Sequence, residues 1–256
     1  MFRILDPLEK DYCSRKEFRD LLNQGKEKVL EIAPLDSPFV NTVNTFYFDV
    51  LPRGDLQKKA ITLGRDPSKV PEIHFHHPNG DLAIVDLKFD VIFSSHCIEH
   101  TPDIISHLCM VRNLLADGGQ YFLFVPDKRY TFDYFKPLSQ VEEMIEAYRL
   151  RSQKPSLKQF MQHSLYRGTH NNREQHWQGD HGKNPYPSKA KFIPSIVKTF
   201  EESSAYLDVH AWIFTPSSFL NALKMLHNSG LMKVSMATVH ETPSMKNEFA
   251  VAIQFE

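Results

Sequence analysis

The chain has 256 residues, of which 41% are hydrophobic and 24% charged, a composition typical of a globular protein with one or two domains. Thirty Lys and Arg residues against 31 Asp and Glu residues give a net charge of −1, which excludes a global positive field for generic nucleic acid. No apolar run approaches the ~18 residues of a membrane span, and the first residues lack the apolar core of a secretory signal. The 3 cysteines form no CxxC pair, so we expect reduced thiols in a cytoplasmic protein.

Helix and strand signals alternate through the first half of the chain. A capping box at Ser14–Glu17 begins a helix that we expect to end at Gly25. Strands that alternate with helices at this spacing predict right-handed β-α-β units and a parallel sheet. The expected strands cover residues 28–33, 46–50, 72–76, 89–94 and 121–125, with helices over 55–63 and 102–115.

The pattern changes after Pro126. A second capping box at Ser139–Glu142 begins a helix to Gln153, and Thr215–Pro216 begins another that ends at Gly230. Further helices are expected up to residue 163 and over 188–203, and two closing strands over 231–238 and 249–255. The sequence therefore predicts a core formed by residues 1–126 and 215–256, with residues 127–214 inserted as a substrate-binding lid.

Polar residues follow several of the expected strands at the point where each strand ends. Glu31, Asp49, the segment Ser94–His100 and the segment Pro126–Tyr130 occupy such positions. Open α/β sheets bind their ligands beyond the carboxyl ends of the strands, at a switch in strand order. We therefore expect these residues to surround a ligand.

The run FDVIFSSHCIEHTPDIISHLCMVRNLLADGGQYFLFVPDKRYTFD resembles the middle of class I S-adenosylmethionine-dependent methyltransferases, with Glu31 and Asp49 in matching order. The resemblance implies an α/β, Rossmann-like sheet of seven mostly parallel strands with helices on both faces and an insertion after strand five. It also implies S-adenosylmethionine as cofactor and S-adenosylhomocysteine as product. The segments PDKRYTFDYFKPLS and DVHAWIFTP are similar to a glycan-associated subgroup, which implies O-methylation of a sugar, nucleotide sugar or surface-polysaccharide component.

The resemblance also implies a cofactor site. Asp49 would accept hydrogen bonds from the ribose hydroxyls, Glu31 would lie near the amino-acid portion, and Asn79 would lie near the adenine. The predicted cofactor-binding residues are Glu31, Ala33, Pro34, Leu35, Asp49, Asn79, Gly80, Ser95 and His96.

The first loop departs from the family's E-x-G-x-G-x-G pattern, because Glu31–Ser37 contains no glycine. Ala33 stands where the first glycine is expected, and its Cβ costs little if φ stays negative. This departure keeps a non-catalytic binding module or partner subunit as the alternative function.

His96, Glu99 and His100 form the most suggestive catalytic cluster. Methyl transfer to a hydroxyl needs a group that takes the proton, and histidine suits this role with an unperturbed pKa of ~6.5. The predicted catalytic residues are His96, His100 and, from the insertion, His210. For His100 an ordering role in the loop is the structural alternative.

The insertion carries an excess of basic residues, 13 Lys and Arg against 7 Asp and Glu over residues 127–198. This excess favours a small-molecule or saccharide acceptor with negative charge. The predicted substrate-binding residues are Asp127, Lys128, Arg129, Tyr130, Arg173 and His176.

No metal ligand set is predicted, since the spacing of His170, His176 and His181 is irregular for zinc. A divalent metal remains a minor alternative. N-methylation of another small molecule is a further alternative reaction. A homodimer is left open, and neither nucleic acid nor a membrane is an expected partner.

Overall fold

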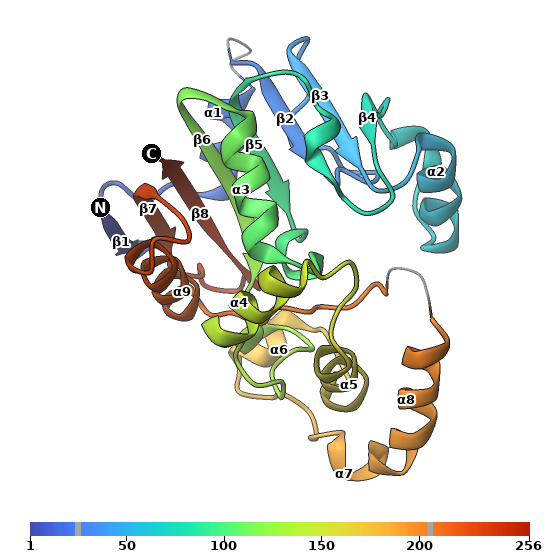
Figure 1. Cartoon of the computed structure of the whole chain (residues 1–256). Coiled ribbons are helices and arrows are strands. Elements are labelled where there is room, and N and C mark those ends of the chain that lie inside the picture. Colours follow the sequence, from blue (N-terminus) through green and yellow to red (C-terminus); the bar gives the residue numbers. More distant parts are fainter. Residues whose placement is uncertain (24–26, 204–206) are drawn as a thin grey trace.

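Eight strands form one sheet in the computed structural model, which describes residues 1–23, 27–203 and 207–256 (Figure 1). The strand order is β1-β7-β8-β6-β5-β2-β3-β4. β8 runs antiparallel to β6 and β7, and the other pairs are parallel. The strands are β1 (Phe2–Leu5), β2 (Val29–Ile32), β3 (Thr45–Asp49), β4 (Phe75–His76), β5 (Phe89–Ser95), β6 (Leu115–Pro126), β7 (Val234–His240) and β8 (Glu248–Phe255). The predicted fold, a mostly parallel Rossmann-like sheet, is confirmed.

The sheet has one strand more than the sequence predicted. The additional strand is β1, which pairs in parallel with β7 at the edge of the sheet. Its four residues were not predicted as a strand because only Leu5 is buried, and so short a segment carries no clear alternation. The predicted end of the first helix at Gly25 lies outside the described residues.

Helices cover both faces of the sheet, as expected. Figure 1 shows α3 and α9 in front of the strands and α1 behind them. The helices are α1 (Arg15–Leu22), α2 (Arg53–Thr62), α3 (Ile104–Leu114), α4 (Val141–Leu150), α5 (Leu157–Tyr166), α6 (Arg173–Trp177), α7 (Tyr186–Lys189), α8 (Ile193–Glu202) and α9 (Pro216–Asn228). Among the described residues, no helix is both long enough and apolar enough to cross a membrane.

β5 shows how the core holds the sheet between these layers. Ile92 belongs to the apolar cluster with α3 and α9, whereas Val91 and Phe93 belong to the cluster with α1. Alternation of side chains along a strand produces this division. Complete burial of one such side chain contributes roughly 1.5–3 kcal/mol, so the central strand anchors both layers.

Two of the three predicted capping boxes and N-caps are confirmed. Ser14 caps α1 together with Glu17, and Thr215 caps α9. The third helix start is one residue later than predicted, because Gln140 caps α4 in place of Ser139. The Ser139 hydroxyl instead accepts a hydrogen bond from the Ile213 N–H at 2.9 Å, and it is therefore used to hold the chain that returns to the core.

The segment between β6 and α9 contains α4 to α8. The short helix α6 lies in a region where the sequence showed no periodicity. The returning chain passes close to the loop after β5, since the N–H groups of Ala211 and Trp212 donate to the carbonyl of Glu99 at 2.7 and 3.1 Å. These bonds bring a distant part of the sequence to the carboxyl end of the sheet.

Candidate active site at the carboxyl ends of the strands

A cavity of about 800 Å³ opens beyond β2, β3 and β5. Its size falls within the ~300–1,000 Å³ of pockets that hold small ligands. β3 and β4 lie on one side of β2, whereas β5 and β6 lie on the other. The cavity therefore lies at the switch in strand order, where open α/β sheets bind their ligands.

The loop after β2 adopts a glycine-like backbone although it contains no glycine. Ala33 and Leu35 both line the cavity, and both have left-handed backbone angles, with φ of 59° and 46°. The condition under which the Cβ of Ala33 would cost little, a negative φ, is therefore not met. A side chain in the left-handed region costs roughly 1–2 kcal/mol per residue, so the sequence retains a strained turn at the wall of the cavity. The N–H of Ala33 donates to the Phe48 carbonyl at 2.9 Å, which ties this turn to β3.

Asp49 presents a buried carboxylate to the cavity at the end of β3. Its Oδ1 accepts a hydrogen bond from the Leu51 N–H at 3.1 Å. Burial raises the pKa of Asp49 to about 6, against the opposing effect of the backbone hydrogen bonds. A ligand that donates hydrogen bonds to this carboxylate would favour its charged form. Asn79 and Gly80 also line the cavity, and the φ of 69° at Gly80 suits glycine.

Glu31 lies outside the cavity lining. Its carboxylate accepts hydrogen bonds from the Phe39 N–H, at 2.8 and 3.0 Å to its two oxygens, and from the Val40 N–H at 2.9 Å. Burial raises its pKa to about 7 despite these bonds. Glu31 therefore shapes the chain beyond the loop, and its contact with the cofactor stays a prediction. Pro34 and Ser95 also lie outside the lining.

His96 lines the cavity at the tip of β5, in a left-handed conformation with φ of 50°. Its Nε2 lies 2.7 Å from Oε2 of Glu248, and its Nδ1 lies 3.8 Å from Oε1 of Glu99. Loss of water alone would lower the pKa of His96, but the hydrogen bond to Glu248 and the charges of Glu99 and Glu248 raise it. The left-handed backbone of His96 is strained, and backbone strain is concentrated at functional sites.

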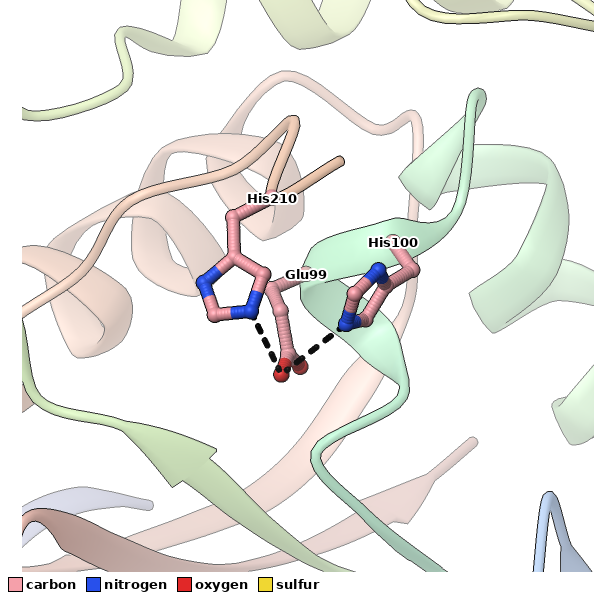
Figure 2. Close-up of side chains that lie close together, drawn as sticks. All are labelled: Glu99, His100 and His210. Atoms are coloured by element: carbon pink, nitrogen blue, oxygen red, sulfur yellow. Dashed lines mark ion pairs between the residues drawn. The ribbon is translucent and has the colours of Figure 1, made fainter. Parts of the chain in front are cut away.

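The side chains of Glu99, His100 and His210 converge (Figure 2). His100 lines the cavity, whereas Glu99 and His210 lie outside the lining. Oε1 of Glu99 lies 3.7 Å from Nε2 of His100 and 4.0 Å from Nε2 of His210. Glu99 is 1% exposed, and neither of its carboxylate oxygens has a hydrogen-bond partner among the described residues. The sequence alone brings Glu99 and His100 together, whereas the hydrogen bonds of the returning chain bring His210 to them.

Each of these two histidines is also held by a carboxylate on its other ring nitrogen. Nδ1 of His100 lies 2.9 Å from Oδ1 of Asp208, and Nδ1 of His210 lies 2.5 Å from Oδ2 of Asp133. Loss of water would lower the pKa of His100, but the hydrogen bond to Asp208 and the charge of Glu99 raise it. Burial would raise the pKa of Asp133, but His210 and Lys136 hold it well below its usual range. Both carboxylates therefore fix the direction of an imidazole.

None of the six predicted substrate-binding residues lines the cavity. Asp127 is fully buried and binds the Arg129 guanidinium and, at 2.6 Å, the Thr242 hydroxyl. Lys128 donates to the Tyr134 carbonyl at 2.7 Å, and Tyr130 stacks on Trp177 with ring centroids 4.0 Å apart. Nδ1 of His176 lies 3.0 Å from Nδ1 of His181, and Arg173 begins α6. These side chains support the segment after β6, and their contact with an acceptor stays a prediction.

Six charged residues that were not among the predicted site residues line the cavity. They are Lys59 in α2, Asp81, Asp103, Arg149 in α4, Arg151 directly after α4, and Asp208. For the two arginines the basic excess of the insertion was the available signal, but it did not indicate which of its residues face the cavity.

A family profile described as a methyltransferase domain matches residues 15–180. No curated protein matches the chain significantly. Among solved structures, the chain is similar to a DhpI–SAH complex, with 12% identity and a TM-score of 0.42, over 89% of this chain and 76% of that one. It is also similar to a putative O-methyltransferase from Nostoc punctiforme (16% identity, TM-score 0.40, over 94% of this chain and 55% of that one). A methyltransferase from Clostridium acetobutylicum shows 15% identity and a TM-score of 0.34, over 50% of this chain and 57% of its own.

All three TM-scores lie below 0.5, and the chain spans little more than half the length of two of these proteins. The family profile, by contrast, covers well over half of the 256 residues and includes the loops after β2, β3 and β5. The chain therefore belongs to this methyltransferase family, which confirms the family that the middle run resembles.

Proposed function

We propose that the cavity holds S-adenosylmethionine and that the protein transfers its methyl group to a hydroxyl of a sugar, nucleotide sugar or surface-polysaccharide component. The observation that carries the cofactor assignment is the buried carboxylate of Asp49, which faces the cavity at the tip of β3. A carboxylate at this position can accept hydrogen bonds from both hydroxyls of a ribose diol. The glycine-like turn at Ala33 and Leu35 supports this assignment because it shapes the adjoining wall.

Two arginines in the cavity lining support an acceptor that carries a phosphate or carboxylate. Arg149 and Arg151 contribute these positive side chains, whereas Lys59 is paired with Asp208 at 3.3 Å. Arginine binds such groups through two parallel hydrogen bonds. On this proposal residues 127–214 act as the substrate-binding lid, chiefly through the end of α4 and through Asp208.

The transfer is an in-line displacement at carbon. A lone pair of the acceptor oxygen forms the O–CH₃ bond, the C–S bond breaks, and its electron pair neutralises the sulfonium. The hydroxyl proton passes to Nδ1 of His96, whose Nε2 is held by Glu248 and whose positive form is stabilised by Glu99. His100, which lines the cavity, orients the acceptor oxygen, and His210 supports this cluster through Glu99. Alignment of this kind contributes several kcal/mol to catalysis.

The test is formation of S-adenosylhomocysteine and of methylated product with a panel of free sugars, sugar phosphates, nucleotide sugars and amines. The expected result is an O-methylated, negatively charged saccharide. His96→Gln should lower kcat by about 10²–10⁴-fold with a smaller effect on KM. His76→Gln is the matched control, because His76 is exposed and lies outside the cavity lining. Methylation only of amines, or full kcat in His96→Gln, would overturn the proposal.

A further inference from the structure

The carboxylate of Glu99 is buried without a hydrogen-bond donor among the described residues. Three imidazole nitrogens face its Oε1, namely Nε2 of His100 at 3.7 Å, Nδ1 of His96 at 3.8 Å and Nε2 of His210 at 4.0 Å. These separations exceed the roughly 2.7–3.2 Å of a hydrogen bond. Burying a charge that is not paired and hydrogen-bonded is costly, so a further group between these atoms would stabilise the arrangement.

The separations match the spacing of ligands around a metal ion. Zinc binds imidazole nitrogen at about 2.0–2.1 Å and carboxylate oxygen at about 2.0–2.2 Å, so neighbouring ligand atoms of a tetrahedral site lie about 3.4 Å apart. The ligand atoms of Glu99, His100 and His210 all lie within 4.8 Å of one another. Shifts of a few tenths of an ångström in side-chain positions would close this set on an ion.

The surroundings of the two histidines provide an independent observation. Metal-binding histidines almost always donate their second ring N–H to a carboxylate, a backbone carbonyl or water, which orients the ring toward the metal. His100 has this contact with Asp208 at 2.9 Å, and His210 has it with Asp133 at 2.5 Å. In both cases Nδ1 faces the supporting carboxylate. The other ring nitrogen, Nε2, faces Glu99 (Figure 2).

We propose that Glu99, His100 and His210 bind one divalent transition-metal ion, of which Zn²⁺ suits the donor set best. Two imidazoles and one carboxylate favour zinc and its neighbours over Mg²⁺ or Ca²⁺, which prefer oxygen ligands. Three protein ligands leave a coordination position for another molecule, as in zinc enzymes. His100 also lines the cavity, so this position adjoins the space assigned to the acceptor.

The site extends the proposed function but does not depend on it. An acceptor hydroxyl bound to the ion would lose its proton more readily, because a bound divalent cation lowers the pKa of its oxygen ligands. Metal binding itself requires neither the methyl donor nor the acceptor. It is therefore measurable even if the acceptor proposed above is wrong.

The experiment titrates the full chain, first treated with a chelator, with ZnCl₂ by calorimetry and with CoCl₂ by visible absorption. We expect one strong site per chain and the intense d–d bands of a four- or five-coordinate Co²⁺ ion. Glu99→Gln should remove the bands. Asp208→Asn removes the charge that supports His100 and that also pairs with Lys59, on a half-exposed side chain, and it should weaken zinc binding by about 10–100-fold without loss of folding.

The insertion contains a second group of histidines that could bind the probe metals. His181→Ala is therefore the matched control, since His181 contacts His176 and lies apart from Glu99. Circular dichroism of each variant establishes that it folds. Unchanged zinc affinity in both Glu99→Gln and Asp208→Asn would overturn the proposal, as would loss of the strong site in His181→Ala or absence of zinc binding by the unsubstituted chain.

Discussion

Replacement of Asp49 by asparagine isolates the group that the cofactor assignment depends on. Asparagine keeps the size of the side chain and one oxygen that accepts the hydrogen bond of the Leu51 N–H. It loses the negative charge and the second oxygen, which would accept hydrogen bonds from the ribose hydroxyls. A hydrogen bond to a charged group contributes about 1.5–3 kcal/mol. Because asparagine retains part of this, we expect a loss of about 2–3 kcal/mol, which corresponds to roughly 30- to 150-fold weaker binding of S-adenosylhomocysteine.

Isothermal titration calorimetry at pH 8 measures this loss directly. Unfolding does not explain the expected effect. The pKa of Asp49 is raised to about 6 in the folded chain, which means that the folded chain holds the charged carboxylate less readily than the unfolded chain. The folded chain therefore loses stability as pH rises from about 4 to about 6. Asparagine carries no charge and avoids that loss. Asp36→Asn is the control, because Asp36 is also buried but pairs with Arg65 at 2.9 Å and does not line the cavity. A dissociation constant within twofold of the unsubstituted protein in Asp49→Asn would refute the assignment.

Three further outcomes are expected. In the unsubstituted chain, binding of S-adenosylhomocysteine should weaken about tenfold between pH 7 and pH 5 as Asp49 takes up a proton, and calorimetry should find a smaller change in Asp49→Asn; equal profiles would contradict this. Ala33→Gly relieves a left-handed residue, so chemical denaturation should show no loss of stability, whereas Ala83→Gly should lose about 0.5–1 kcal/mol; equal losses would count against strain at Ala33. Lys136→Ala removes the ion-pair partner of Oδ1 of the buried Asp133, at 2.6 Å, and leaves the contact of Oδ2 with His210; it should cost about 1–3 kcal/mol in the same assay, so an unchanged stability would be inconsistent with the buried pair.

The sequence predicted the parts of the fold that repeat a local pattern. Buried strands such as β5 alternate their side chains between two faces, and helices such as α9 begin at residues whose side chains bind free N–H groups. β1 escaped prediction because an edge strand of four residues has almost no buried side to reveal it. The start of α4 was misplaced because Ser139 binds a residue far along the chain, which no local rule detects.

The candidate site divides in the same way. The order of the strands places Asp49 and His96 at the cavity, and both positions follow from where their strands end. The backbone of Ala33 could not be read from residue type, since alanine rarely adopts a positive φ. The contact between Glu99 and His210 depends on hydrogen bonds from Ala211 and Trp212, and these form only when the returning chain packs against the core.

The position of the cofactor is the central claim, and a crystal structure of the complex with S-adenosylhomocysteine tests it most directly. We expect ribose hydroxyls within hydrogen-bond distance of the Asp49 carboxylate, the adenine beside Asn79, and the sulfur directed toward His96. Density for the nucleoside at another place on the chain, with Asp49 facing only solvent or protein, would contradict it.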